Sequence, residues 1–119
     1  MAKSRFPQRV YRDGDEPDPR FSLANERTFL AWLRTSLALF AAAIALEALQ
    51  LPINAGWRLA GAVVFLVLGV IAAVQAWFGW VATEKSLRRG AALPGLSIGG
   101  VLVVGVIVGV AIIFVGGLV

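Results

Sequence analysis

Three arginines that recur at intervals of seven residues have the clearest chemical potential in this sequence: Arg20, Arg27 and Arg34. A seven-residue step drifts by only about 20° on a straight α-helix, so one helix would carry them as a single arginine stripe. Arg34 lies inside the apolar run 29–46, where a charge is costly unless it snorkels, pairs or faces water. Rings of such arginines select anions such as phosphate. A lone stripe would instead bind the phosphate of anionic lipid.

Residues for catalysis or metal binding are scarce. The chain has no Cys and no His, which removes thiolate sites, the commonest general base and the commonest metal ligand. Four of its seven acidic residues fall in the stretch 13–18, which glycine and proline interrupt. No nucleophile–base pair or phosphate-cradling loop is present. We therefore expect no catalytic residue, no metal and no cofactor, and a protein that is not an enzyme.

Further polar residues accompany the stripe. Asn25, Glu26 and Thr28 predict a polar network at the same level of the helix. The i+4 neighbour of Glu26 is apolar, so we expect its partner to come from Arg88 or Arg89, or from a neighbouring subunit. Those two arginines also join the candidate residues for binding an anion or a lipid phosphate.

Apolar composition indicates the element type that must position these residues. Of 119 residues, 59% are hydrophobic and 15% charged, with a mean hydropathy of +0.81. So few charges cannot cover the core of a soluble domain, and the sequence predicts an all-α integral membrane protein. We expect a flexible tail over 1–21 and a transmembrane domain over 22–119. Its three helices should span about 22–50, 57–83 and 93–118, with Ser22 capping the first and Pro94 opening the third.

Basic residues predict the orientation. Ten of the eleven Lys and Arg lie in the N-terminal tail, the start of the first helix and the loop after the second, and only Arg58 lies on the other side. The positive-inside rule then places the N terminus in the cytoplasm and the C terminus outside. Topology also explains the pI of about 10.7, so the expected partner is the lipid bilayer and not nucleic acid. A Glu47–Arg58 contact across the outer turn is expected.

Glycines recur in the third helix. Gly95 and Gly99, like Gly105 and Gly109, have the spacing that lets helix backbones approach closely. Either this face packs against a neighbouring helix, within one subunit or between subunits, or glycine is simply frequent in membrane helices.

Residues 21–39, with the core Ala24-Asn25-Glu26-Arg27-Thr28-Phe29-Leu30 followed by Trp32, resemble the signature of the YidH-like family. The resemblance covers about residues 20–119 and implies a small multi-pass protein of the bacterial plasma (inner) membrane with a domain of unknown function.

The same core resembles the membrane domain of vacuolar transporter chaperone subunits, which forms an oligomeric pore for polyphosphate. This resemblance implies a homo-oligomer with basic pore positions at Arg20 and Arg27 and Glu26 beside them. Arg34 departs from that pattern, and the soluble domains of those subunits have no counterpart here. We expect a homo-oligomeric channel or transport-related module for phosphate or polyphosphate. The alternative is a non-conducting structural protein that binds anionic lipid or a partner through its basic face.

Overall fold

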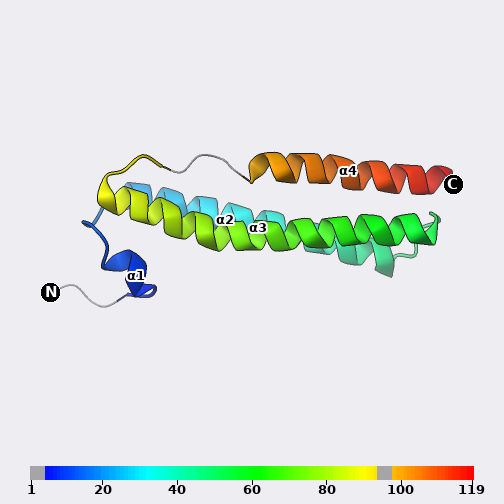
Figure 1. The fold of residues 1–119 in the computed structure, drawn as a ribbon. Helices are drawn as coiled ribbons and strands as arrows, with labels where there is room; N and C mark the ends of the chain where they lie inside the picture. Colours follow the sequence, from blue (N-terminus) through cyan, green and yellow to red (C-terminus); the bar gives the residue numbers. More distant parts are fainter. Residues whose placement is uncertain (1–4, 94–97) are drawn as a thin grey trace.

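The computed structural model describes residues 5–93 and 98–119, which form four helices. These are α1 (Gln8–Tyr11), α2 (Pro19–Ala48), α3 (Ala55–Arg89) and α4 (Gly99–Leu118). Figure 1 shows α2 and α3 as a long antiparallel hairpin, with α4 beside the part of α3 nearest the hairpin turn and α1 at the other end. We call the end where α1 lies, α2 begins and α3 ends the basic end.

The helices α2, α3 and α4 are each long and apolar enough to cross a membrane. At about 1.5 Å per residue they measure roughly 45, 52 and 30 Å, against a hydrocarbon layer of about 30 Å. The prediction of three helices that are long and apolar enough to span a membrane is therefore confirmed. Because α4 matches the layer and starts partway along α3, α2 and α3 extend beyond it at the basic end (Figure 1).

Helix ends differ from the expected ones for local reasons. Asp18, and not Ser22, caps α2, since its side chain accepts a hydrogen bond of 2.9 Å from the backbone N–H of Arg20. Pro19 therefore occupies the first turn, where proline is well tolerated. The second membrane helix, α3, continues to Arg89 instead of ending near residue 83. Gly90 ends it in the left-handed region at φ +66°.

The third membrane helix, α4, starts later than predicted. Leu93 is not helical and α4 begins at Gly99, while Pro94 and Gly95 lie outside the described residues. The tail expected over residues 1–21 is more structured than predicted, because α1 forms there and contacts α3.

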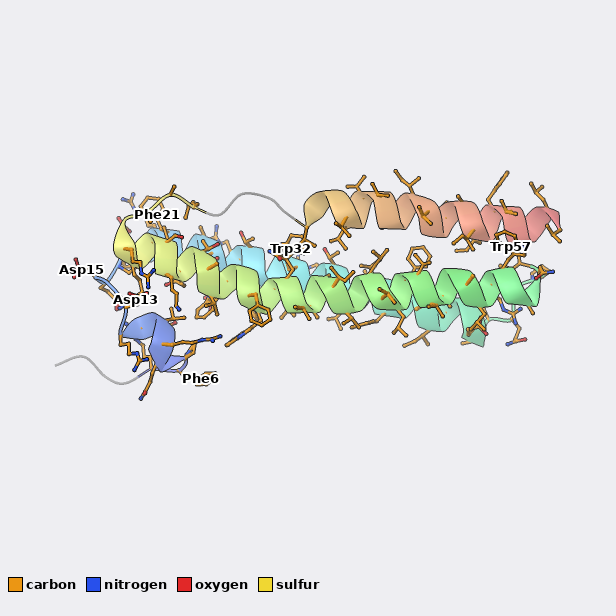
Figure 2. All side chains as sticks on the ribbon, viewed as in Figure 1. Phe6, Asp13, Asp15, Phe21, Trp32 and Trp57 are labelled. Atoms are coloured by element: carbon orange, nitrogen blue, oxygen red, sulfur yellow. The ribbon has the colours of Figure 1, made fainter. Side chains whose placement is uncertain are left out.

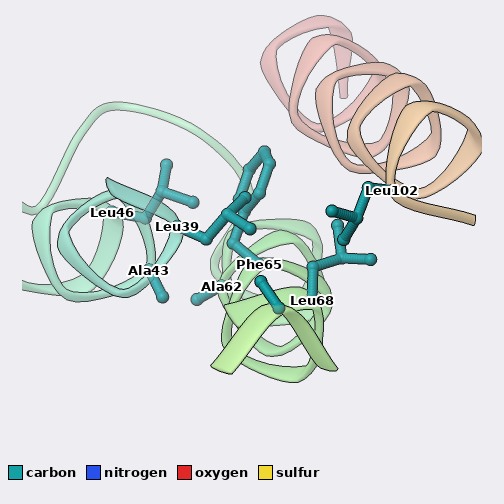
Figure 3. Close-up of a cluster of buried hydrophobic side chains, with 8 residues drawn as sticks. Leu39, Ala43, Leu46, Ala62, Phe65, Leu68 and Leu102 are labelled. Carbon is teal, nitrogen blue, oxygen red and sulfur yellow. The ribbon is translucent and has the colours of Figure 1, made fainter. Parts of the chain in front are cut away.

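The buried core places α3 between the other two membrane helices (Figure 3). Leu39, Ala43 and Leu46 of α2 pack against one side of α3, and Leu102 of α4 packs against the other. The α3 residues of this cluster are Ala62, Phe65, Leu68 and Ala72. Within the described residues α3 contacts both neighbours, whereas α2 and α4 do not contact each other.

Glycines of α4 allow its close approach to α3. A Cβ on Gly105 would lie 2.4 Å from Cδ2 of Leu68, and one on Gly109 would lie 3.0 Å from Cζ of Phe65. The predicted packing role of these two glycines is thus found within the subunit. Gly99 opens α4, and Gly95 is not among the described residues.

The hairpin turn is fastened to α4 at the end opposite the basic end. Asn54 caps α3 by accepting hydrogen bonds from the N–H groups of Gly56 and Trp57. Its own N–H donates to the carbonyl of Gly116 at 3.0 Å. The expected contact across the turn is confirmed, with 3.5 Å between Arg58 Nε and Glu47 Oε1.

Candidate functional site

The arginine stripe is carried by one helix, as its spacing predicts. Arg20, Arg27 and Arg34 all lie on α2 and are all exposed. Arg20 is paired with Asp18, with 2.9 Å between Nη2 and Oδ2. Among the residues that the structure describes, Arg27 and Arg34 make no hydrogen bond or ion pair. Two guanidinium groups of the stripe, those of Arg27 and Arg34, therefore have no partner among these residues that compensates their charge.

Contacts between α2 and α3 fix the depth of each arginine. The Ser36 hydroxyl donates to the carbonyl of Gly69 at 2.8 Å, and the Asn25 amide donates to that of Trp80 at 3.1 Å. Arg27 therefore lies near the level of Trp80, where aromatic residues mark the membrane interface. Arg34 lies about 10 Å deeper, close to the level of Gly69.

The depth of Arg34 can be compared with α4. Leu68, which precedes Gly69 on α3, packs against Gly105, and Gly105 lies about 9 Å inside the start of α4. Arg34 is thus within the layer that α4 can span, on a surface of α2 that no described residue covers with a polar group. A charge at this depth requires water, lipid phosphate or another chain.

Small side chains accompany the stripe. Ala24, Ala31 and Ala38 recur at the same seven-residue spacing on the exposed surface of α2. Small residues let a second helix approach closely in a membrane. The surface that presents Arg27 and Arg34 can therefore accommodate a neighbouring helix.

A polar network does form at the start of α2, and of its three predicted members Asn25 belongs to it, whereas Glu26 and Thr28 do not. Glu84 of α3 is only 2% exposed and accepts hydrogen bonds from Ser22 Oγ at 3.3 Å and Asn25 Nδ2 at 3.4 Å. Thr28 instead donates to the carbonyl of Ala24 in its own helix. Glu26 is exposed and makes no hydrogen bond or ion pair to any residue in the described ranges.

Glu84 is the functional candidate that the sequence analysis missed. The structure continues α3 through this position, which places Val81, Glu84 and Arg88 on one buried face. The spacing of these residues by three and four is a helical signal that could have revealed the continuation.

The two arginines at the end of α3 hold the N-terminal segment, which we define as residues 5–18. Arg88 is buried and donates to the carbonyls of Tyr11 at 2.6 Å and Asp13 at 2.7 Å, and to Glu16 Oε2 at 3.0 Å. Arg89 pairs with Asp13 at 2.6 Å. The expected pairing of Glu26 with Arg88 or Arg89 is therefore not found among the described residues, and both arginines instead pair with the N-terminal segment.

Charge pairing shifts the carboxyl groups of the N-terminal segment. The hydrogen bond from Arg89 lowers the pKa of Asp13, and that from Arg5 lowers the pKa of Glu16, to which Arg88 adds. The hydrogen bonds from Arg20 likewise lower the pKa of Asp18. The lowered pKa values of Asp13 and Glu16 mean that pairing with Arg89 and Arg88 favours their ionised forms and holds the segment on the end of α3. Asp18 instead pairs with Arg20 at the start of α2.

The described residues hold no group of three or more acidic side chains that could bind a metal ion. Three long apolar helices define a small multi-pass membrane protein, with a basic end and a stripe in which two of the three arginines have no partner among the described residues.

Comparison with known proteins identifies the family. The model of the domain of unknown function DUF202 matches residues 20–86, from the first arginine of the stripe to near the end of α3. The chain belongs to the DUF202 family.

Relatives support this assignment. The chain is 37% identical over 114 residues to the inner membrane protein YidH of Escherichia coli K12, covering 93% of this chain and 96% of YidH. It is 43% identical over 95 residues to the uncharacterized protein Rv2272 of Mycobacterium tuberculosis H37Rv, covering 78% and 77%. The resemblance to the YidH-like family and the inner-membrane localisation are confirmed. No solved structure matches.

Proposed function

We propose that this protein assembles with copies of itself so that the arginine stripe lines a path for anions such as phosphate or polyphosphate. Arg34 carries this proposal, because it is exposed within the layer that α4 spans and no described residue compensates it. A water-filled path between subunits would remove the cost of burying this charge. The exposed alanines beside it would let the subunits approach.

The three levels of the stripe suit anion entry from the basic end, which the positive-inside rule places in the cytoplasm. Arg20 lies in the part of α2 that projects beyond α4, Arg27 near Trp80, and Arg34 one heptad deeper. Successive basic sites of this kind attract an anion without trapping it at one position. The proposed role is non-enzymatic.

Anion efflux from proteoliposomes at matched protein density tests the proposal. We expect Arg34→Gln to lower phosphate efflux about tenfold, which corresponds to a barrier increase of roughly 1.4 kcal/mol. Arg34→Lys should retain most of the flux because it keeps the charge. Arg12→Gln is the matched control, since Arg12 is an exposed arginine outside the stripe. Equal efflux from wild-type protein and Arg34→Gln would contradict the role of the stripe.

The alternative function is a non-conducting module whose stripe binds anionic lipid or a partner protein. The position of Arg27 favours it, because the level of Trp80 is also the level of lipid phosphates. The subunit mass in nanodiscs separates the two functions. A monomer has no second chain to enclose a path, so a monomer without efflux would establish the alternative, and a closed ring with Arg34-dependent efflux would exclude it.

A further inference from the structure

A cavity of about 590 Å³ lies between the N-terminal segment and α3, away from the arginine stripe. It is lined by Arg5, Phe6, Pro7, Gln8, Arg9 and Trp77. Figure 2 shows Phe6 beside α1, on the outer side of the α2–α3 hairpin. Phe6 is 85% exposed, so no described residue covers much of this apolar surface.

Aromatic contacts place this cavity at the membrane interface. The ring of Phe6 stacks on Trp77 with centroids 6.2 Å apart, and Trp77 stacks on Trp80 at 5.8 Å. Tyr11 and Phe29 add tilted and edge contacts to Trp80. Tryptophan and tyrosine favour the headgroup region, and beyond Trp80 the sequence of α3 becomes charged. The cavity therefore opens at the level of lipid headgroups.

The charges at the rim of the cavity are positive. Arg5 is paired with Glu16 and lies over the ring of Tyr11, 4.2 Å from its centroid. Arg9 is exposed and makes no hydrogen bond or ion pair to any other residue in the described part of the chain. One guanidinium group at the rim is thus uncompensated, next to an apolar wall.

We propose that the cavity binds one anionic phospholipid. Its phosphate pairs with Arg9, and its glycerol and upper acyl carbons cover Phe6 and Trp77. A free phosphate ion would leave the apolar wall bare, whereas a phospholipid satisfies both the charge and the apolar surface. The site shares no residue with the arginine stripe, so the proposal stands independently of anion conduction.

Lipid retention measured by native mass spectrometry tests this site. Detergent-solubilised protein is mixed with phosphatidylglycerol or phosphatidylcholine of equal chain length. We expect wild-type protein to retain phosphatidylglycerol about fivefold more, the effect of one arginine near an anionic headgroup. Arg9→Gln should abolish this preference and Arg9→Lys should keep it, while Phe6→Ala should weaken retention of both lipids.

Two controls locate the bound lipid. Arg12→Gln alters an exposed arginine of the same segment that does not line the cavity, and Arg27→Gln alters the stripe. Both should keep the preference for phosphatidylglycerol. The proposed site would be wrong if Arg9→Gln kept the preference for phosphatidylglycerol. It would also be wrong if Arg27→Gln alone lost this preference. Displacement of the lipid by millimolar inorganic phosphate would identify a free-anion site and also overturn the proposal.

Discussion

Glu84 shows how a single side chain joins α2 to α3 near the basic end. Its buried carboxylate accepts from two neutral donors, the Ser22 hydroxyl and the Asn25 amide. A buried polar group that loses its partner costs more than the net value of the hydrogen bond itself. Glu84 is therefore an organising residue for this end of the hairpin.

We expect Glu84→Ala to lower the free energy of unfolding by about 1–3 kcal/mol, because the Asn25 amide loses one of its two acceptors. Glu84→Gln keeps an acceptor oxygen and should destabilise less. Denaturant unfolding of the detergent-solubilised protein measures both values. Glu26→Ala is the matched control, since Glu26 is an exposed carboxylate on the same turn of α2 as Asn25. A loss in the control as large as that in Glu84→Ala would disprove the special role of the buried carboxylate.

The positions of residues on one helix could be predicted from their spacing in the sequence, whereas contacts between helices could not. The heptad spacing predicted that Arg20, Arg27 and Arg34 share one helix, because a helix repeats closely every seven residues. The partners of Asn25 could not be predicted in the same way. Glu84 is 59 residues away from Asn25 in sequence, and its position depends on the register of two packed helices.

At the scale of elements, the glycines of α4 determine how closely it approaches α3. Gly109 is buried against Phe65 and Val64, whereas a Cβ at Gly100 would meet none of the described residues of other elements within 4 Å. The two glycines share one helix and differ in their surroundings. They therefore form a matched pair of positions for testing the α3–α4 contact.

Gly109→Leu should destabilise the protein by about 1–3 kcal/mol, because the added side chain meets the packed surface of α3. Gly100→Leu should be neutral or slightly stabilising, since leucine has the higher helix propensity. Thermal unfolding of both variants in the same detergent measures the difference. Equal unfolding temperatures would contradict the close packing of Gly109.

The sequence predicted that the three membrane helices exist, but it predicted their ends less well. Long apolar runs predict membrane helices because backbone groups must be paired inside a bilayer. Pro19 falls within the tail expected over residues 1–21, yet proline suits the first turn of a helix and Asp18 supplies the cap, so α2 starts earlier. The end of α3 is set by Gly90, whereas the charges from Glu84 onward suggested an earlier end.

For the whole molecule, charge pairs dock the N-terminal segment onto the end of α3. The lowered pKa values of Asp13 and Glu16 mean that these acids favour the docked state when they are ionised. Docking is thus stabilised at pH values above the ordinary carboxyl pKa of about 4. It weakens as the pH falls below this value, through the lowered pKa values of the docked state.

Tryptophan fluorescence should report this undocking, because Trp77 and Trp80 contact the segment through Phe6 and Tyr11. We expect little change between about pH 7 and pH 5 and a transition below about pH 4. Arg88→Gln removes the guanidinium group that binds the segment. This variant should already have, at neutral pH, the fluorescence spectrum that the wild-type protein has at low pH. A transition centred between pH 5 and pH 7 would refute this linkage.

The docking of this segment could not be predicted from the sequence. Its two prolines and one glycine are typical of a flexible tail, and α1 has only four residues. The contacts that order it join Tyr11, Asp13 and Glu16 to Arg88 across 72 to 77 residues. Such long-range contacts leave no periodic signal in the sequence.

The central position of α3 has a consequence for how the chain is made. Within the described residues α2 and α4 each contact α3 and not each other, so a ribosome delivers α2, α3 and α4 in the order in which they come together. The N-terminal segment is the exception. It is synthesised before the three membrane helices, but its anchor Arg88 follows Asp13 by 75 residues in the chain. This segment therefore docks only after the α2–α3 hairpin has been translated, although the segment itself is translated before the hairpin.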